Sequence, residues 1–255
     1  MGVLSLVVAD PVASARLTNA LSQSYRLVFH DSWSDFEGRR RSLDPHAVIV
    51  DILDPAGPHT IDHLMDVSRD GGFGVVICSS FDGKEDRFLA LGAAGVGGII
   101  LPREIHDRAQ VRGEVERAIA RAVSDDAVAV LPSGIPAMAR SALRWSIRHA
   151  TEGASVAGLA AELGCSPGAL RRSFQQAGLP SAKRTLMWGR LFFAARELAR
   201  GTPSVERLAH RLGYASRSGL TRMMSRELGA PPRVLRRRDV WREAVDAYAR
   251  ETSES

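Results

Sequence analysis

Short apolar runs alternate with amphipathic stretches along the first half of the chain. The runs are rich in Val and Ile, which favour strands, and comprise Val3–Val8, Tyr25–Phe29, Ala47–Ile52, Val75–Cys78 and Ile99–Leu101. Between them, apolar residues recur at helical spacing in Val12–Leu21, Ile61–Val67, Arg87–Ala93 and Val111–Ala122. This alternation predicts an α/β domain over residues 1–123, in which helices cover a five-stranded parallel sheet.

The pattern changes at the segment Ser124–Pro136, which contains two acidic residues followed by two prolines and a glycine. Such a composition interrupts regular structure and predicts a linker over residues 124–136. Beyond it the Val-rich and Ile-rich runs disappear, and helical spacing continues from residue 137 to residue 250. We therefore expect an all-α second domain over 137–250 and a polar tail over 251–255.

One approximate duplication stands out in the helical half. The stretch SVAGLAAELGCS at Ser155–Ser166 is repeated as SVERLAHRLGYAS at Ser204–Ser216. In each copy the first Ser is suited to cap a short helix, and a Gly, Gly164 or Gly213, permits the tight turn after it. A second helix is expected after each turn, so the duplication predicts two helix-turn-helix units.

The second helix of each unit is expected to have a buried face and a solvent face, and Ser166 and Ser216 are expected to cap it. The residues expected to pack inward are Leu170, Phe174, Leu220 and Met224. The opposite faces carry Arg171, Arg172, Gln175, Arg217, Ser218, Thr221 and Arg222. These side chain types hydrogen-bond to base edges in a major groove, so both helices are candidate recognition helices.

A helix with a strongly apolar face, Arg184–Arg200, joins the two copies. Its apolar residues are Leu186, Met187, Leu191, Phe192 and Leu198. At 1.5 Å per residue it spans about 25 Å. Held apart in this way, two recognition helices would enter adjacent major-groove segments on one side of DNA.

Charge separates the two halves of the chain. Residues 1–135 contain 13 Lys and Arg against 19 Asp and Glu, a net −6, whereas residues 136–255 contain 21 against 10, a net +11. A basic, helical half with a duplicated motif indicates a partner that is a polyanion, namely double-stranded DNA. The alternative is a protein-interaction or architectural module whose helical half does not read DNA sequence.

Ala142–Arg238 resembles the DNA-binding domain of AraC/XylS-type transcription regulators, including the closing stretch GYASRSGLTRMMSRELGAPPRVLRRR at Gly213–Arg238. The resemblance implies a bacterial transcription regulator that binds double-stranded DNA and contacts RNA polymerase. It also places base contacts at six positions, namely Gly168, Arg171, Arg172, Arg217, Ser218 and Arg222. Because Gly168 has no side chain where the family usually has one, we expect the second helix-turn-helix unit to dominate the reading of DNA sequence.

Residues 3–122 resemble the receiver domain of response regulators, which implies a five-stranded parallel α/β fold. Asp51 follows the third predicted strand, at the family's phospho-acceptor position. Asp10 closes the first strand and Ser79 follows the fourth, where the family has a metal-binding acid and a hydroxyl that senses the phosphoryl group. The resemblance therefore makes Asp51 a phospho-acceptor candidate within an acidic pocket formed with Asp10 and Ser79.

Three other receiver positions lack the expected residue. Ala9 replaces an acid, Leu101 replaces the lysine before a proline, and Gly98 replaces the aromatic switch residue. Phosphoryl transfer depends on cations that neutralise the equatorial oxygens, and a leucine carries no charge. We therefore expect a receiver-like domain that works without phosphorylation, through homodimerisation or ligand binding.

The remaining sequence features point away from enzymes and membranes. The chain has no P-loop, nucleophile elbow or HExxH motif, so no catalytic residue, cofactor or metal is expected. Its two cysteines, Cys78 and Cys165, lack a partner at metal-ligand spacing. The first residues reach Asp10 too early for a signal peptide, and no apolar run approaches the roughly 20 residues of a membrane span, so a cytoplasmic location is expected.

Overall fold

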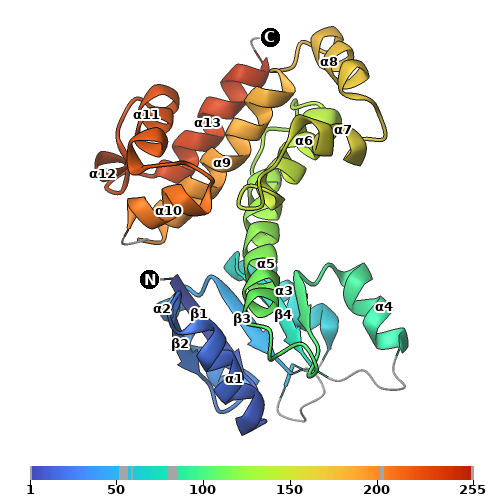
Figure 1. Cartoon of the computed structure of the whole chain (residues 1–255), viewed down its shortest axis with the longest axis vertical. Coiled ribbons are helices and arrows are strands. Elements are labelled where there is room, and N and C mark those ends of the chain that lie inside the picture. The colour runs from blue at the N-terminus through green and yellow to red at the C-terminus, as the bar shows by residue number, and fades with distance from the viewer. Residues whose placement is uncertain (1, 52–56, 59, 80–84, 202–203, 254–255) are drawn as a thin grey trace. The chain divides into compact units, whose positions relative to one another are not determined.

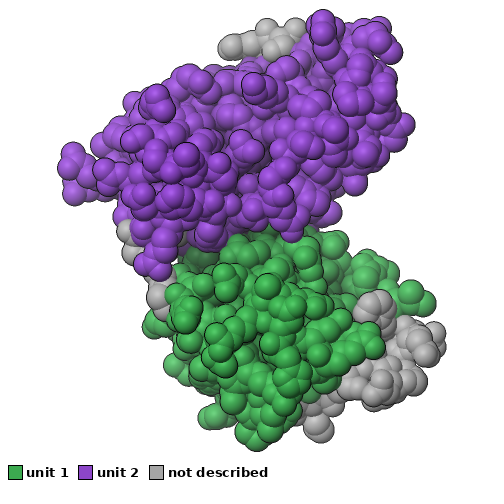
Figure 2. All heavy atoms as spheres, in the orientation of Figure 1, with its two compact units in different colours: residues 1–122 green, residues 123–255 purple. Residues whose placement is uncertain are grey.

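The computed structural model describes residues 2–51, 57–58, 60–79, 85–201 and 204–253. The chain forms two compact units, residues 1–122 and residues 123–255 (Figure 2). Among the described residues, no helix is both long enough and apolar enough to cross a bilayer.

The first unit is a parallel sheet with helices between its strands (Figure 1). Its elements are β1 (Gly2–Val7), α1 (Pro11–Leu21), β2 (Tyr25–Phe29), α2 (Trp33–Leu43), β3 (Ala47–Val50), α3 (Ile61–Gly71), β4 (Gly74–Cys78), α4 (Glu85–Ala94), β5 (Gly98–Ile100) and α5 (Arg108–Ala129), the last of which continues into the second unit. The strand order is β2-β1-β3-β4-β5, and every strand pair is parallel. This order is typical of the flavodoxin-like folds to which receivers belong, so the predicted α/β class is confirmed.

Both faces of the sheet are covered, which explains why its strands are apolar on both sides. One face packs against α2, α3 and α4 through a cluster that includes Phe36, Leu64 and Leu91. The alternate strand residues, Leu4, Leu6, Ile49 and Val76, are buried as well. At β4, a Cβ on Gly74 would lie 2.5 Å from the Ala118 carbonyl carbon, so α5 approaches the sheet at backbone distance.

Helix α2 was not predicted, and its composition explains the omission. Of its eleven residues only Trp33 and Phe36 are buried, so the helix carries almost no apolar stripe. Its start is set by Ser32, whose hydroxyl accepts a hydrogen bond from the Asp35 amide at 3.2 Å. A short apolar contact with the core and an N-cap are enough to hold a helix that periodicity alone does not reveal.

The segment 124–136, which was expected to lack regular structure, is partly helical. Helix α5 continues to Ala129, and only the following residues leave the helix before α6 begins. Within the second unit, the Arg148 guanidinium donates to Asp125 at 3.0 Å, and Arg140 donates to the Val128 carbonyl at 3.1 Å. These bonds stabilise the helical part, while the role of the segment as a linker stays a prediction.

Within the described part of the second unit, every element of regular structure is a helix, as predicted. The unit comprises the end of α5 followed by α6 (Ala137–Arg148), α7 (Val156–Glu162), α8 (Pro167–Gln176), α9 (Ala182–Ala199), α10 (Val205–Arg211), α11 (Arg217–Leu228), α12 (Pro232–Leu235) and α13 (Val240–Ser253). The polar tail was expected from residue 251, but α13 extends to Ser253 and Glu251 forms an ion pair with Arg184.

Helix α9 is the central element of this unit. It contacts α6, α7, α8 and α13, and α13 runs beside it in Figure 1. The rings of Trp188 and Phe192 on α9 pack edge-on against Tyr248 on α13. On the side facing α6, a Cβ on Gly189 would lie 2.5 Å from the Ser146 carbonyl carbon. Two helix backbones meet there with no room for a side chain.

Replacing Gly189 with alanine is expected to lower the free energy of unfolding by about 1–3 kcal/mol, because the added methyl must push α6 and α9 apart. Urea unfolding followed by circular dichroism measures the change. Gly168→Ala is the matched control, since the nearest atom to its new Cβ is a flexible arginine tip at 3.9 Å. Equal stability of the two variants would show that α6 and α9 do not need this close approach.

Candidate nucleic-acid interface

The first helix-turn-helix is built from α7, a tight turn and α8. The Ser155 hydroxyl caps α7 by accepting a hydrogen bond from the Gly158 amide at 3.1 Å. Gly164 then adopts a φ of +67°, a left-handed conformation that glycine tolerates best. Ser166 caps α8 by accepting from the Ala169 amide at 3.2 Å. The capping and turn roles predicted for these residues are confirmed.

The second helix-turn-helix repeats this construction in α10 and α11 with one difference. The Ser204 hydroxyl accepts from the Arg207 amide at 3.2 Å, and Gly213 adopts a φ of +75°. Ser216 occupies the N-cap position of α11, but its side chain forms no capping hydrogen bond. The expected capping bond of Ser216 is therefore wrong, although the helix begins where it was predicted.

The two faces of α8 and α11 divide as the periodicity predicts. The inward residues Leu170, Phe174, Leu220 and Met224 are all buried. The outer faces carry six exposed residues, Arg171, Arg172, Gln175, Arg217, Ser218 and Arg222, whereas Thr221 is half-buried. The structure thus presents the predicted base-reading side chains to solvent, and their contact with bases stays a prediction.

Helix α9 connects the two helix-turn-helix units and also forms an ion pair with the second of them. Its 18 residues correspond to a length of about 27 Å. On α10, Arg211 donates to the buried Glu197 carboxylate of α9 at 2.9 Å and lies over the Phe193 ring. Because Glu197 is only 2% exposed, its charge needs this partner. The ion pair sets the position of α10 along α9.

Sequence reasoning missed a second charged cluster, which joins α9, α11 and α13. Arg184 donates to Glu227 of α11 at 2.8 and 2.5 Å, and to Glu251 of α13 at 2.7 Å through two nitrogens. The Trp188 indole N–H also donates to Glu251, at 3.0 Å. The partners lie 43 and 67 residues from Arg184 in sequence, so no local pattern announces them.

The cluster shifts the pKa of its members. Burial would raise the pKa of Glu227, but hydrogen bonds from Arg184 and Arg226 outweigh burial and lower it. Hydrogen bonds to Glu251 and Glu227 in turn raise the pKa of Arg184 despite its partial burial. The charges of Glu227 and Arg184 are therefore present at neutral pH, and they hold the C-terminal end of the second candidate recognition helix against α9.

In the first unit, Asp51 and Ser79 meet at the carboxyl ends of β3 and β4. The Ser79 hydroxyl donates to the Asp51 carboxylate at 2.6 Å. Asp10 instead caps α1, accepting a hydrogen bond from the Val12 amide at 2.9 Å. Burial and the nearby Asp51 and Asp10 charges raise the pKa of Cys78 to about 12, so its thiol is protonated at neutral pH.

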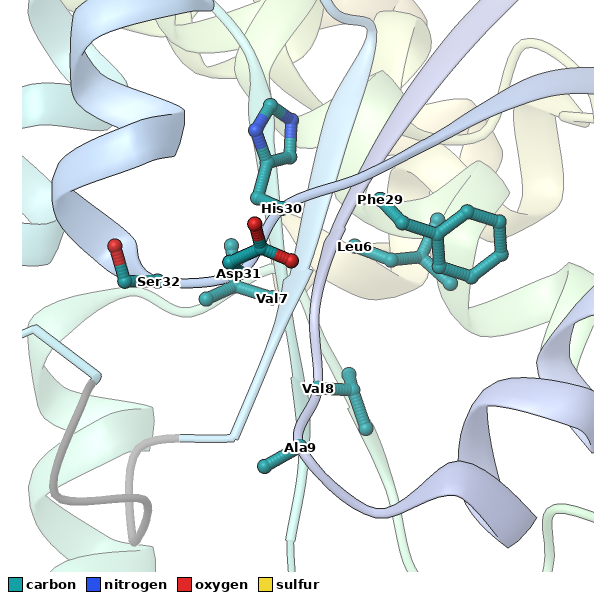
Figure 3. Close-up of a pocket in the computed structure, with 8 residues that line it drawn as sticks. All are labelled: Leu6, Val7, Val8, Ala9, Phe29, His30, Asp31 and Ser32. Atoms are coloured by element: carbon teal, nitrogen blue, oxygen red, sulfur yellow. The ribbon is translucent and has the colours of Figure 1, made fainter.

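A cavity of about 390 Å³ opens beside the ends of β1 and β2 (Figure 3). Its wall includes Ala9 and Asp31, together with His30, whose ring nitrogens lie 2.9 Å from Asp35 and 3.1 Å from Ser5. Across the described residues, no three His, Cys, Asp or Glu side chains are grouped to bind a metal. The cavity is thus bordered by hydrogen bonds that already satisfy its histidine.

The receiver position held by Gly98 has a structural reason for lacking an aromatic residue. A Cβ at Gly98 would lie 2.7 Å from the Glu114 carbonyl oxygen of α5. The side chain of Glu114 also accepts a hydrogen bond from the Ile99 amide at 3.1 Å. Helix α5 therefore occupies the space that a larger residue on β5 would need.

Comparison with known proteins identifies the helical unit. Residues 159–238 match a family model described as a helix-turn-helix domain, and the match runs from α7 to the end of α12 and just beyond. This segment is an AraC-type helix-turn-helix domain. Among curated proteins, no relative matches the sequence. The AraC-type domain and the receiver-like topology together indicate a DNA-binding transcription regulator.

Several solved structures are distantly similar. A DNA-binding transcriptional dual regulator from Escherichia coli K-12 is 21% identical, with a TM-score of 0.38, over 42% of this chain and 96% of its own. Full-length FixJ from B. japonicum is 17% identical, with a TM-score of 0.37, over 88% and 96% of the two chains. The RcsB response regulator from Salmonella typhimurium is 14% identical, with a TM-score of 0.39, over 73% and 97%. Likenesses this distant assign no function to this chain.

Replacing Arg184 with glutamine is expected to lower the free energy of unfolding by roughly 2–4 kcal/mol at pH 7, because it leaves the Glu227 and Glu251 carboxylates without their shared cation. The pKa of Glu227 is held below its ordinary value of 4.5, so the stabilisation exists above that pH and is lost as the pH falls through the lowered value. The gap between wild type and variant should therefore narrow below about pH 4.5 in urea unfolding.

The control for this experiment is Arg242→Gln, which removes a cation that is 79% exposed and lies 3.9 Å from its partner Asp246. Its effect should stay below about 1 kcal/mol. A gap between wild type and the Arg184 variant that stays constant with pH would contradict the assigned role of the carboxylates.

Proposed function

We propose that this protein regulates transcription by reading two adjacent major-groove segments, one with α8 and one with α11. The proposal rests on the exposure, and the lack of ion pairing within the described residues, of four arginines on the outer faces of these helices, Arg171, Arg172, Arg217 and Arg222. All four are exposed, and within the described part of the chain none of them forms an ion pair. Their guanidinium groups are available for guanine edges and phosphates.

Other arginines of the same unit behave differently, which makes the contrast informative. Arg196 pairs with Asp126 at 2.5 Å, and Arg211 pairs with Glu197 at 2.9 Å. Both are directed into the packing between helices. The protein therefore pairs the arginines that hold the domain together and leaves those on the candidate recognition faces unpaired, as a polyanion-binding surface requires.

The separation of the two faces supports simultaneous reading. A rigid α9 of about 27 Å approaches the roughly 34 Å repeat of the DNA duplex, and the width of the two units adds to that span. A protein with one such helix-turn-helix would read a shorter site. Two units on one rigid helix therefore favour a site of two adjacent half-segments.

Selection of bound duplexes from a random DNA pool is expected to recover a two-part motif with the full-length protein. Changing Arg217 and Arg222 to alanine should erase the part read by α11, whereas Arg171→Ala with Arg172→Ala should relax selection less, because α11 is proposed to dominate. Each lost bidentate contact should cost about 1–3 kcal/mol of discrimination against the wrong base.

Arg242→Ala serves as the charge control and should leave the motif intact. Binding without any motif would replace the proposal with an architectural role, and absence of binding would favour a protein-interaction module. A greater loss of selectivity from the two α8 substitutions than from the two α11 substitutions would show that α8, and not α11, dominates the reading of DNA sequence.

For the N-terminal unit, we propose regulation that does not use phosphorylation. The Asp51 carboxylate accepts the Ser79 hydroxyl at 2.6 Å, and Asp10 is engaged in capping α1. Leu101 supplies no cation where phosphoryl transfer needs one. Homodimerisation through this unit and contact of the protein with RNA polymerase belong to the same proposal.

Incubation with acetyl phosphate and Mg²⁺ is expected to add no phosphoryl group to the protein, because Leu101 stands where the transferring group needs a side-chain cation. Intact-protein mass spectrometry checks for the added mass. Asp51→Asn should leave DNA affinity unchanged, and Asp31→Asn is the matched control. A stoichiometric mass increase that Asp51→Asn alone abolishes would overturn the proposal.

A further inference from the structure

A groove of about 710 Å³ follows one flank of α11 and extends to the beginning of α9. Its wall includes Lys183, Arg184, Arg190, Tyr214, Arg222 and Arg226. Five of the ten lining residues are Lys or Arg, and none is Asp or Glu. So dense a grouping of one charge sign repels itself, which indicates that an anion belongs in the groove.

Two of the five cations are already neutralised, and three are not. Arg184 is held by Glu227 and Glu251, and Arg226 donates to Glu227 at 2.5 Å. Lys183, Arg190 and Arg222 form no ion pair with any residue that the structure describes. Three positive charges therefore face the groove without a carboxylate to balance them.

The half-buried Arg190 is positioned by an aromatic ring. Its guanidinium carbon lies 5.9 Å from the centre of the Tyr214 ring, and its Nε is buried without a hydrogen-bond partner. Burial raises the pKa of Tyr214 although Arg190 opposes the shift, so the phenol stays protonated at neutral pH. The first turn of α9, capped by Ser181, lies at the other end of the groove and adds the positive end of a helix dipole.

The position of the groove identifies its occupant. An α-helix with its side chains is about 10–12 Å wide and a major groove is about 12 Å wide, so a recognition helix has a DNA strand against each flank. Arg222 belongs both to the outer face of α11 and to the groove wall. A duplex that meets the outer face therefore brings one sugar-phosphate backbone along this flank.

We propose that the groove binds backbone phosphates of the DNA duplex, with Lys183 and Arg190 as contacts that position α11 and carry no sequence information. The proposal rests on the proposed DNA binding and extends it from the base-reading face to the flank. In this proposal α9 contributes to DNA affinity as well as to packing. It does so through two side chains, Lys183 and Arg190, that do not belong to the predicted recognition faces.

The test compares wild type with Lys183→Gln, Arg190→Gln and the double variant in binding to a selected duplex and to an unrelated one. The double variant should lose affinity by the same factor for both duplexes, and the slope of log K against log salt should become shallower by about two, one for each phosphate contact. Arg242→Gln, which removes an exposed charge outside the groove, should leave both slopes unchanged.

Thermal unfolding by circular dichroism shows whether the variants fold, and Lys183→Gln alone keeps the test informative if Arg190→Gln destabilises the domain, because Lys183 is exposed. Unchanged affinity and slope in a folded Lys183→Gln variant would overturn the proposal. Calorimetric titration with inorganic pyrophosphate separates the other source of phosphate. Binding of pyrophosphate that the double variant abolishes, with duplex affinity unaffected, would assign the groove to a free phosphate compound and also overturn it.

The outcomes separate this proposal from the proposed function. If wild type binds all duplexes equally, sequence-specific reading fails, yet an equal loss of affinity and a shallower slope in the double variant would still support phosphate binding in the groove. If wild type selects a motif and the double variant keeps its affinity, the groove proposal fails alone.

Discussion

The helical unit depends on the burial of one helix from several sides. Helix α9 packs against α6, α7, α8 and α13, and Gly189 lets the backbone of α6 approach it without an intervening side chain. A helix buried in this way has little freedom to rotate or slide, because interiors are close-packed and each shift creates voids or overlaps. The four helices that pack on α9 therefore take their position from it.

Ion pairs restrict the helices further than apolar packing alone. A buried ion pair adds a specific penalty for movement. A shift of α10 would separate Glu197 from Arg211 and leave a desolvated charge. Arg184 has the same effect at the other end of α9, where it joins α11 and α13. Compared with apolar residues of similar size such pairs add little stability, although removal of one partner is costly, and their larger effect is to fix one arrangement of the helices.

Local features of the chain predicted what local physics controls. The strands, the turn glycines and the inward residues Leu170 and Phe174 follow from propensity and periodicity, and the structure places them as expected. Helix α2 was not predicted because its two buried residues are too few to show a helical period. The predicted capping bond of Ser216 is absent because a serine at the N-cap position need not form one. The Arg184 cluster and the groove beside α11 join residues that are distant in sequence, so only the fold brings them together.

The fold of the first unit does not itself depend on phosphorylation chemistry. Its sheet is stabilised by apolar contacts on both faces, which need neither a metal nor a phosphoryl group. At β5 the close approach of α5 to Gly98 fills the space that an aromatic switch would use, and Ser79 satisfies Asp51 within the protein. With phosphorylation proposed to be absent, this unit would have no chemical step to couple to a rearrangement. Under that proposal, any signal it transmits comes from what binds its surface, and the energy available for regulation is the differential affinity of that partner for the conformations of the unit.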